Sequence, residues 1–432
     1  MNKLSLLILI FLIINNCSIT KKQRFWGKEK SNIQENENIK TILTKQSKIE
    51  VEFNSKLKIK VSDGKLSRQF RNNQNNVGEL FYEGLLKKIG KYNFSKFDDF
   101  EFIDLEPVFY NDKVIISDNK GTIILYDENQ KIIWKKNYYN KDEKKLKPRL
   151  NFAIQKDILI VTDDVTKYYT INVDTGELIW SKNNIAPFNS EIKIKDNYFY
   201  VVDYKNILRS ISIKDGSELW NLKTEESLTK SNTRISIVIK NRNIYFNNSI
   251  GDITSVDLKS GQLAWQLPTQ SNDISKNAFQ LSSSKLVIIG DAILFSNNKD
   301  EFYSIDATRG LINWKNEINS NLKPVMINKF IITVTDKGYL YVMDKKRGNI
   351  IRINDLYKDY KIKNKNNLYP TGFLVAKNKV YLSNNNGHLI IADLSTGNVL
   401  NTIKISGNKI LKPLINNNNL FIIKNGSIIR FN

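Results

Sequence analysis

The sequence predicts an all-β fold, an eight-bladed β-propeller built from four-stranded antiparallel blades. Two observations carry this prediction. A short glycine-to-tryptophan motif recurs along the chain at the spacing of a propeller blade, and the last segment supplies only three strands where a blade needs four. The composition is that of a folded protein, since 41% of the 432 residues are hydrophobic.

The recurring motif is a Gly followed four residues later by a Trp. Intact copies end at Trp180, Trp220, Trp265 and Trp314. Several copies add an Asp four residues before the Gly, namely Asp257, Asp306, Asp344 and Asp393. A strand, a turn whose Gly takes a positive φ and a second strand make a hairpin, and the Asp can accept hydrogen bonds from the N–H groups of the turn. We expect the tryptophans to pack between blades rather than to form a platform for a cofactor.

The same frame continues with substitutions. Arg352 and Asn401 stand in the Trp place, and Gln130 stands in the Gly place before Trp134. The anchors at 134, 180, 220, 265, 314, 352 and 401 are 46, 40, 45, 49, 38 and 49 residues apart. Leu85, taken as a further anchor, lies 49 residues before Trp134. Eight anchors predict eight blades.

The two ends of the chain decide how the ring closes. The last segment offers strands at 411–415, 420–424 and 427–431, and the run 84–89 can pair with them as the fourth strand. We therefore expect residues 84–432 to form a propeller in which N- and C-terminal strands share one blade, which removes exposed sheet edges. A seven-bladed ring with residues 49–100 as an appendage is the alternative.

Residues 1–16 have the pattern of a secretory signal peptide. Lys3 gives a positive start, and the run from Leu4 to Ile14 is apolar except for Ser5 and short for a permanent membrane helix. The following residues up to Cys17 resemble a bacterial lipobox, so we expect Cys17 to be lipidated. The alternative is that Cys17 is an incidental residue of a cleaved leader. Residues 17–48 are polar and charge-mixed and predict a flexible tether, and 49–83 would form an N-terminal extension.

The hairpin motif resembles the pyrroloquinoline-quinone-type propeller repeat. Together with the lipoprotein leader, it makes the chain similar to the BamB family of outer-membrane assembly lipoproteins, and segments 49–61 and 70–78 resemble the extra N-terminal segment of its alphaproteobacterial members. The resemblance implies a non-catalytic scaffold of the outer-membrane β-barrel assembly machinery, lipid-anchored at the periplasmic face of the outer membrane. It implies docking on the periplasmic domains of BamA, contact with other subunits of the machine, and contact with unfolded outer-membrane proteins.

The resemblance also implies where the partner contact lies. In that family the contact comes from loops between blades in the middle of the chain, which correspond by position to 225–234 and 271–274. The candidate residues for partner binding are Leu228, Lys230, Arg234 and Asp273. For each of them, the role of an ordinary solvated loop residue is equally open.

Composition limits the alternatives. One Cys and one His allow no internal disulfide, no multi-Cys metal site and no His cluster, and we expect no catalytic residue, cofactor or metal. A quinoprotein dehydrogenase would resemble its family in having adjacent cysteines, a calcium site and an Asp base, and nothing here matches the cysteine clamp. A periplasmic propeller that binds cell-wall glycan is a further alternative. The net charge of +22 favours acidic surfaces, but the lysines are scattered, so we expect no nucleic-acid partner.

Overall fold

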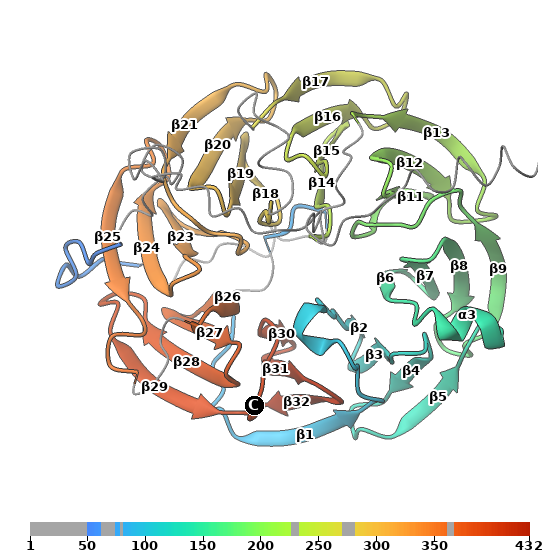
Figure 1. The fold of residues 1–432 in the computed structure, drawn as a ribbon, viewed down its shortest axis with the longest axis horizontal. Coiled ribbons are helices and arrows are strands. Elements are labelled where there is room, and N and C mark those ends of the chain that lie inside the picture. Colours follow the sequence, from blue (N-terminus) through green and yellow to red (C-terminus); the bar gives the residue numbers. More distant parts are fainter. Residues whose placement is uncertain (1–49, 62–73, 78–80, 226–232, 270–280, 361–366) are drawn as a thin grey trace, which may run out of the picture. The chain divides into compact units, whose positions relative to one another are not determined.

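The computed structural model describes residues 50–61, 74–77, 81–225, 233–269, 281–360 and 367–432. The chain divides into two units, Met1–Glu50 and Val51–Asn432. In the second unit, eight four-stranded antiparallel sheets stand around a common axis as the blades of a propeller (Figure 1). The predicted fold is confirmed, with eight blades rather than seven.

Blades 1 to 4 run outward from the axis in chain order (Figure 1). Blade 1 contains β2 (Val108–Tyr110), β3 (Lys113–Ser117), β4 (Ile123–Tyr126) and β5 (Ile132–Lys136). Blade 2 contains β6 (Leu150–Gln155), β7 (Ile158–Asp163), β8 (Lys167–Asn172) and β9 (Leu178–Asn183). Blade 3 contains β10 (Lys193–Lys195), β11 (Tyr198–Val202), β12 (Ile207–Ser212) and β13 (Glu218–Lys223). Blade 4 contains β14 (Ile237–Lys240), β15 (Asn243–Asn247), β16 (Ile253–Asp257) and β17 (Leu263–Leu267).

Blades 5 to 7 repeat this order, and blade 8 is shared between the ends of the chain. Blade 5 contains β18 (Val287–Ile289), β19 (Ala292–Asn297), β20 (Glu301–Asp306) and β21 (Ile312–Asn316). Blade 6 contains β22 (Val325–Ile327), β23 (Phe330–Val334), β24 (Tyr339–Asp344) and β25 (Ile350–Asp355). Blade 7 contains β26 (Pro370–Ala376), β27 (Lys379–Asn384), β28 (His388–Asp393) and β29 (Val399–Lys404). Blade 8 contains β30 (Leu414–Asn416), β31 (Asn419–Lys424), β32 (Ser427–Phe431) and β1 (Lys88–Asn93).

Helices are short in the described part of the chain. A 3₁₀ turn, Phe100–Phe102, precedes blade 1, and α3 (Lys141–Lys145) lies between blades 1 and 2, where Asn140 and Glu143 form a capping box. Within the described ranges, no helix has the length and apolar character to cross a membrane.

Blade 8 closes the ring as predicted, because β1 pairs antiparallel with β32. In Figure 1 the blue β1 lies beside the red β32. The strand begins at Lys88, however, and Leu85 is 89% exposed, so Leu85 is not an anchor. Gly90 occupies the Trp position instead, since the β-bulge beside it matches the bulge beside Trp134. A Cβ on Gly90 would lie 3.0 Å from the Gln130 side chain. At this junction the large and small residues have therefore exchanged places.

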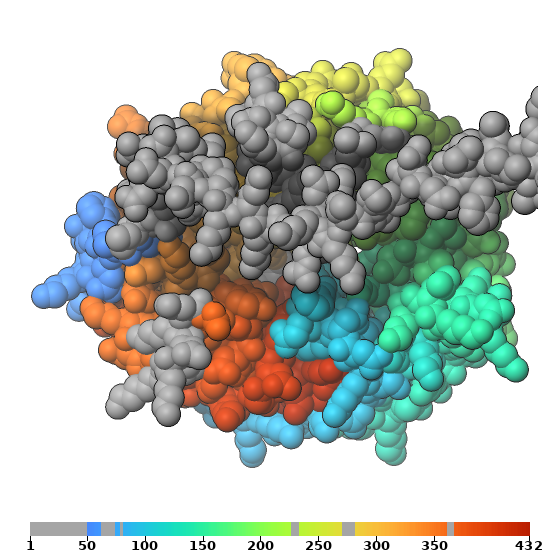
Figure 2. All heavy atoms as spheres, in the orientation of Figure 1, coloured from blue at the N-terminus to red at the C-terminus, as the bar shows by residue number. Residues whose placement is uncertain are grey.

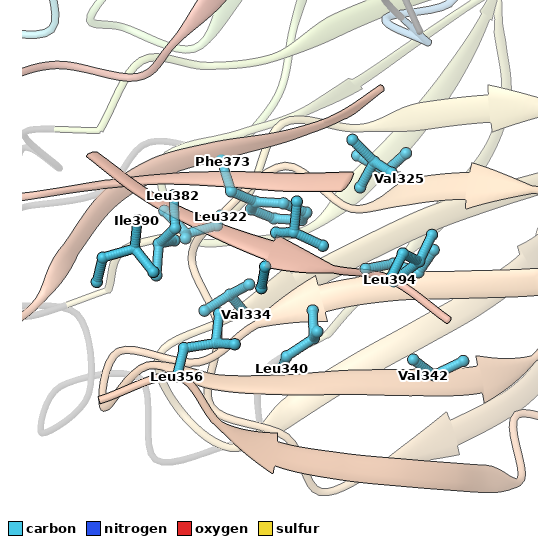
Figure 3. Packing of buried hydrophobic residues seen from close by; sticks show 14 of the residues in the cluster. Leu322, Val325, Val334, Leu340, Val342, Leu356, Phe373, Leu382, Ile390 and Leu394 are labelled. Carbon is cyan, nitrogen blue, oxygen red and sulfur yellow. The ribbon is translucent and has the colours of Figure 1, made fainter. Parts of the chain in front are cut away.

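The hydrophobic core is a set of wedges between blades rather than one central core. Eight clusters of buried apolar side chains occur among the described residues, and each joins two neighbouring blades. Figure 3 shows the cluster between blades 6 and 7, where Val325, Val334 and Val342 face Phe373, Leu382 and Ile390. Both faces of every blade are buried in this way, which explains the long apolar runs of the second and third strands.

The Gly and Trp of the motif meet across the five junctions from blade 1 to blade 6. The ring of a Trp lies on the Gly of the next blade, so that Trp180 covers Gly216, Trp220 covers Gly261 and Trp314 covers Gly348. Four indole Nε1 groups donate to the carbonyl oxygen three residues before that Gly, from Trp134 to Val173 at 2.9 Å, Trp180 to Ile213 at 2.8 Å, Trp265 to Ala307 at 3.1 Å and Trp314 to Lys345 at 3.1 Å. The prediction that these tryptophans pack between blades is confirmed.

The predicted Asp turn caps are also present. Oδ1 of Asp257 accepts from the backbone N–H groups of Lys259 and Ser260 at 3.0 and 2.9 Å. Asp306 and Asp344 make the same pair of bonds in their own blades. These hydrogen bonds favour the ionised carboxylate, and those from Ser260 are the main cause that lowers the pKa of Asp257.

Arg352 replaces the Trp at the junction between blades 6 and 7. Its Nη2 donates to the Leu394 carbonyl oxygen at 2.6 Å, which is the same position, three residues before the Gly, that the tryptophans bind. Its Nη1 donates to Leu57 at 2.9 Å and Ser395 at 2.5 Å. Arg352 therefore makes the hydrogen bond that a Trp makes at other junctions, and it also binds the N-terminal extension through Leu57.

The extension runs along the outer edge of the same blade. Phe53 pairs with Ile353 of β25 through bonds of 3.2 and 2.8 Å, and the Ile59 N–H donates to the Ser395 carbonyl oxygen at 2.9 Å. The Ile59 side chain is buried in the cluster between blades 6 and 7. Residues 53–59 thus form a short strap on a junction that lacks a Trp.

We expect Gly261→Ala to destabilise the propeller more than Gly290→Ala. Both glycines have positive φ, 72° and 57°, but a Cβ at Gly261 would lie 2.6 Å from the Trp220 ring, whereas a Cβ at Gly290 meets nothing within 4 Å. In both variants the left-handed backbone conformation of an Ala lowers the free energy of unfolding by about 1–2 kcal/mol. In the Gly261 variant the clash with the Trp220 ring lowers it by about a further 1–3 kcal/mol. Denaturant unfolding measures the difference. Equal free energies of unfolding for the two variants would contradict the Gly–Trp contact as a close-packed junction.

We expect Arg352→Met to release the strap while the propeller stays folded. Losing charge-assisted hydrogen bonds to Leu57 and Ser395 should speed amide exchange of Phe53 and Ile59 by about 10- to 100-fold. Arg347→Met is the matched control, because Arg347 is exposed on the neighbouring turn. Hydrogen exchange followed by mass spectrometry measures this change. Unchanged protection of the amides in 51–60 would show that Arg352 does not hold the strap.

Candidate partner-binding face

The connections between successive blades lie on one face of the ring. Each blade has four antiparallel strands, so the chain leaves an outermost strand and enters the next innermost strand at the same end. Figure 2 views this face, with α3 of the first such connection on the right. The two loops singled out by the sequence are connections of this kind, joining β13 to β14 and β17 to β18.

The candidate residues divide between described and undescribed parts of these loops. Leu228, Lys230 and Asp273 lie outside the described residues, as does Cys17 of the leader. Arg234 is described and lies just before β14, partly buried.

Hydrogen bonds tie the described ends of the two loops to the ring and to each other. At the start of the first loop, Asn206 Nδ2 donates to the Glu225 carbonyl oxygen at 2.7 Å and to Ser249 Oγ at 2.8 Å. At its end, Thr233 Oγ1 donates to the Leu281 carbonyl oxygen at 3.2 Å. Leu281 ends the second loop, so the structure brings the ends of both loops together at blades 4 and 5.

The positive charge of Arg234 acts on two carboxylates, those of Asp104 and Asp164. Burial raises the pKa of Asp104, but the positive charges of Lys412, Arg234 and Lys285 outweigh it and hold that pKa below its usual value. Arg234 also opposes the rise in pKa that burial causes at Asp164. The cation of the candidate loop therefore acts on carboxylates of blades 1 and 2.

A ring of polar residues occupies the start of the innermost strands. In every blade this residue stands four positions before the last residue of the innermost strand. In blade order the eight residues are Glu106, Asn151, Glu191, Ser236, Lys285, Lys323, Gly372 and Lys412. We call this set the axial ring.

Ion pairs show that the side chains of the axial ring meet at the axis. Lys285 Nζ lies 2.9 Å from Glu106 Oε2, and these residues belong to blades 5 and 1, on opposite sides of the ring. Glu106 Oε2 also lies 2.7 Å from Lys412 Nζ. Glu191 Oε2 lies 3.5 Å from Lys285 Nζ and 3.3 Å from Lys193 Nζ. Burial opposes ionisation of Glu191, yet Lys193, Lys285 and the hydrogen bond from Asn76 lower its pKa to about 2.

The segment 74–77 of the N-terminal extension lies against one sector of the axial ring. Asn76 Nδ2 donates to Glu191 Oε1 at 2.9 Å, to Ser236 Oγ at 3.2 Å and to the Leu286 carbonyl oxygen at 2.9 Å. The backbone carbonyl oxygens of Gln74 and Asn75 accept from Ile239 and Ile288 at 2.8 and 3.2 Å. The segment therefore joins blades 3, 4 and 5 at the axis.

The sequence reasoning missed the axial ring. The signal for it was a Lys or Glu followed by Pro and an apolar residue just before the innermost strand, in Glu106-Pro107, Lys323-Pro324 and Lys412-Pro413. Aligning the blades on their innermost strands rather than on their tryptophans would have revealed it.

Within the described ranges, no group of three or more His, Cys, Asp or Glu side chains is placed to share a metal ion. His388 is satisfied locally, since its Nδ1 lies 2.9 Å from the Asn386 carbonyl oxygen and its ring meets Tyr360 edge-on at 5.3 Å. Burial lowers its pKa.

Comparison with solved structures shows the same fold in proteins of different function. BamB from Moraxella catarrhalis superposes with a TM-score of 0.66 at 14% identity, covering 80% of this chain and 99% of that one. The quinohemoprotein alcohol dehydrogenase of Comamonas testosteroni superposes with a TM-score of 0.59 at 10% identity, covering 80% of this chain and 76% of that one. At these identities the likeness shows the propeller alone.

Comparison of sequences is more specific. The outer membrane protein assembly factor BamB of Shewanella oneidensis is 20% identical over 258 residues, which are 58% of this chain and 62% of that protein, so the match spans less than two thirds of the relative. A family model described as outer membrane protein assembly factor BamB matches residues 119–354, more than half of the chain. The chain belongs to the BamB family of outer membrane protein assembly factors.

Proposed function

We propose that the protein is a non-catalytic scaffold lipoprotein of the outer-membrane β-barrel assembly machinery. It docks on the periplasmic domains of BamA and contacts other subunits of the machine while outer-membrane proteins are inserted. The observation that carries this proposal is the family match over residues 119–354. The geometry supports it, because the ends of the two implied contact loops are hydrogen-bonded together on one face of the ring.

The leader supports a place at the periplasmic side of the outer membrane. Residues 1–16 would direct export, and a lipid on Cys17 would anchor the protein, with 17–48 as a tether. Export also separates the protein from cytoplasmic nucleic acid, in keeping with a protein partner.

The strap at blade 6 supports contact with extended chains. Phe53 pairs with the open edge of β25, the outermost strand of its blade. An outermost strand of this propeller can therefore take up an extended segment through main-chain hydrogen bonds. Unfolded outer-membrane proteins are segments of this kind.

The residues of the axial ring do not fit the calcium site of a quinoprotein dehydrogenase. In that enzyme class, calcium needs carboxylate and amide oxygens near the axis. Here Glu106 and Glu191 are both neutralised by lysines, and the Asn76 amide is bound to Glu191. A cation at this place would meet four ammonium groups. Reconstitution with quinone and calcium tests this alternative directly, and pull-down of the sacculus tests binding to cell-wall glycan.

We expect Cys17→Ser to move the protein from the membrane to the soluble periplasmic fraction, because a lipid chain is what would hold it. Ser18→Ala is the matched control and should stay in the membrane fraction. Fractionation and incorporation of a lipid label are the measurements. A Cys17→Ser protein that still fractionates with membranes would refute the anchor.

We expect Leu228→Ala combined with Arg234→Ala to weaken co-purification with BamA from native membranes by roughly tenfold or more. Since these are loop substitutions, the free energy of unfolding should change by only about 0.5 kcal/mol. Leu219→Ala with Arg242→Ala is the control, because Leu219 is 53% exposed on β13 and Arg242 lies in the β14–β15 turn, at the end of β14 away from Arg234. Unaltered recovery of BamA with the first pair would refute the loop site.

A further inference from the structure

One cation of the axial ring has no counter-ion. Lys285 and Lys412 pair with Glu106, and Lys193 and Lys285 pair with Glu191. Four lysines at the axis therefore share Glu106 and Glu191, and Asp104 is a third carboxylate under the charges of Lys412 and Lys285. In the described part of the chain, Lys323 Nζ has no carboxylate within 4 Å.

The charges around Lys323 make this site electropositive. Burial, together with the positive charges of Lys412 and Lys285, lowers the pKa of Lys323 to about 8. Glu106 and Glu191 act in the opposite direction but do not restore the usual value. An anion at this place would remove the repulsion among the three lysines.

The charged groups of the axial ring are accessible to solvent. Although their side chains meet at the axis, Lys285 and Lys412 are each 22% exposed and Glu106 is 35% exposed, so solvent reaches the axial ring. Asn76 covers the sector of blades 3 to 5. In blade 7 the ring position is Gly372, where a Cβ would overlap the Lys412 side chain. Lys412 therefore packs directly against Gly372 and takes the place that a larger side chain would occupy.

The backbone conformations of Lys323 and Lys412 are restricted by the residue that follows each of them. Pro follows Lys323 and Lys412 directly, and the residue before a Pro is restricted to extended conformations. Two positions further along the innermost strands, the layer below the axial ring is apolar in seven blades and is a Lys, Lys193, in the eighth. These apolar residues are Val108, Ala153, Val238, Val287, Val325, Leu374 and Leu414. All of these apolar residues except Val108 pack in the wedges between blades.

We propose that Lys323, Lys412 and Lys285 form a binding site for a tetrahedral dianion of the phosphate class at the mouth of the axial channel. The positive charges of Lys323, Lys412, Lys285 and Arg234 exceed the negative charges of Glu106 and Asp104, and a dianion can pair with two ammonium groups at once, whereas a monocarboxylate carries a single charge. The site lies at the end of the innermost strands where the chain enters them from the loops between blades. It is independent of any contact with BamA.

Sulfate is the best probe, because it is a dianion that does not titrate near pH 8. We expect titration calorimetry of the full-length protein at pH 8 and constant ionic strength to show saturable sulfate binding. In two buffers of different ionisation enthalpy, binding should take up about half a proton per site as Lys323 becomes fully charged. Inorganic phosphate should compete, and chloride should not.

Three variants test the assignment. Lys323→Met should weaken sulfate binding by roughly tenfold or more and abolish proton uptake. Lys323→Arg keeps a permanent charge, so it should bind sulfate without proton uptake. Lys329→Met, an exposed lysine in the turn at the other end of β22, should behave as wild type. Thermal melting confirms that each variant is folded.

The proposal is overturned if wild type shows no saturable sulfate or phosphate binding up to about 10 mM, a concentration that corresponds to very weak affinity. It is also overturned if Lys323→Met binds as tightly as Lys329→Met, or if Lys323→Arg takes up protons as wild type does. Co-purification with BamA is scored separately, so failure of this site and failure of the scaffold role give different results.

Discussion

The contact between an aromatic ring of one blade and a glycine of the next is the constraint on which the propeller depends. The indole lies where a Cβ would be, and its N–H reaches the carbonyl oxygen three residues before the glycine. This contact fixes the angle between neighbouring blades and seals the apolar wedge behind it. Because the core is divided into wedges, no blade can bury both of its faces alone, and the ring is stable only when it is closed.

Two of the three junctions that lack the Trp show what the contact must achieve. At the closing junction, Gly90 takes the large residue's place and Gln130 takes the small one's, so the same gap is filled from the opposite side. At the junction of blades 6 and 7, Arg352 makes the hydrogen bond of the indole and uses its other nitrogen to hold Leu57. The N-terminal extension is thus attached where the repeat is irregular.

The axis of the ring carries charged side chains, whereas the wedges between blades are apolar. The innermost strands converge there, and five of the eight axial-ring positions carry charged groups, which pair between blades as well as within blade 3. Asn76 of the extension satisfies Glu191 on one side, while the lysines on the other side outnumber their carboxylates. The ring therefore carries its loops between blades on one face and charged groups at its axis.

The sequence by itself determined the class of fold, the number of blades and the shared closing blade. The reason is that the Gly–Trp motif is local and repeats at a period close to one blade, so its meaning does not depend on distant contacts. Tertiary structure alone decided the anchor of the closing blade. The folded ring shows that Gly90, and not the exposed Leu85, meets the Gln130 side chain of the next blade. It also decided the partners of Arg352 and the axial ring, whose residues are up to some 300 positions apart in sequence. Of the candidate partner residues, the sequence placed Arg234 in its loop, but only the folded ring shows that its charge reaches the carboxylates of blades 1 and 2. Long-range electrostatics depends on distances that no local pattern encodes.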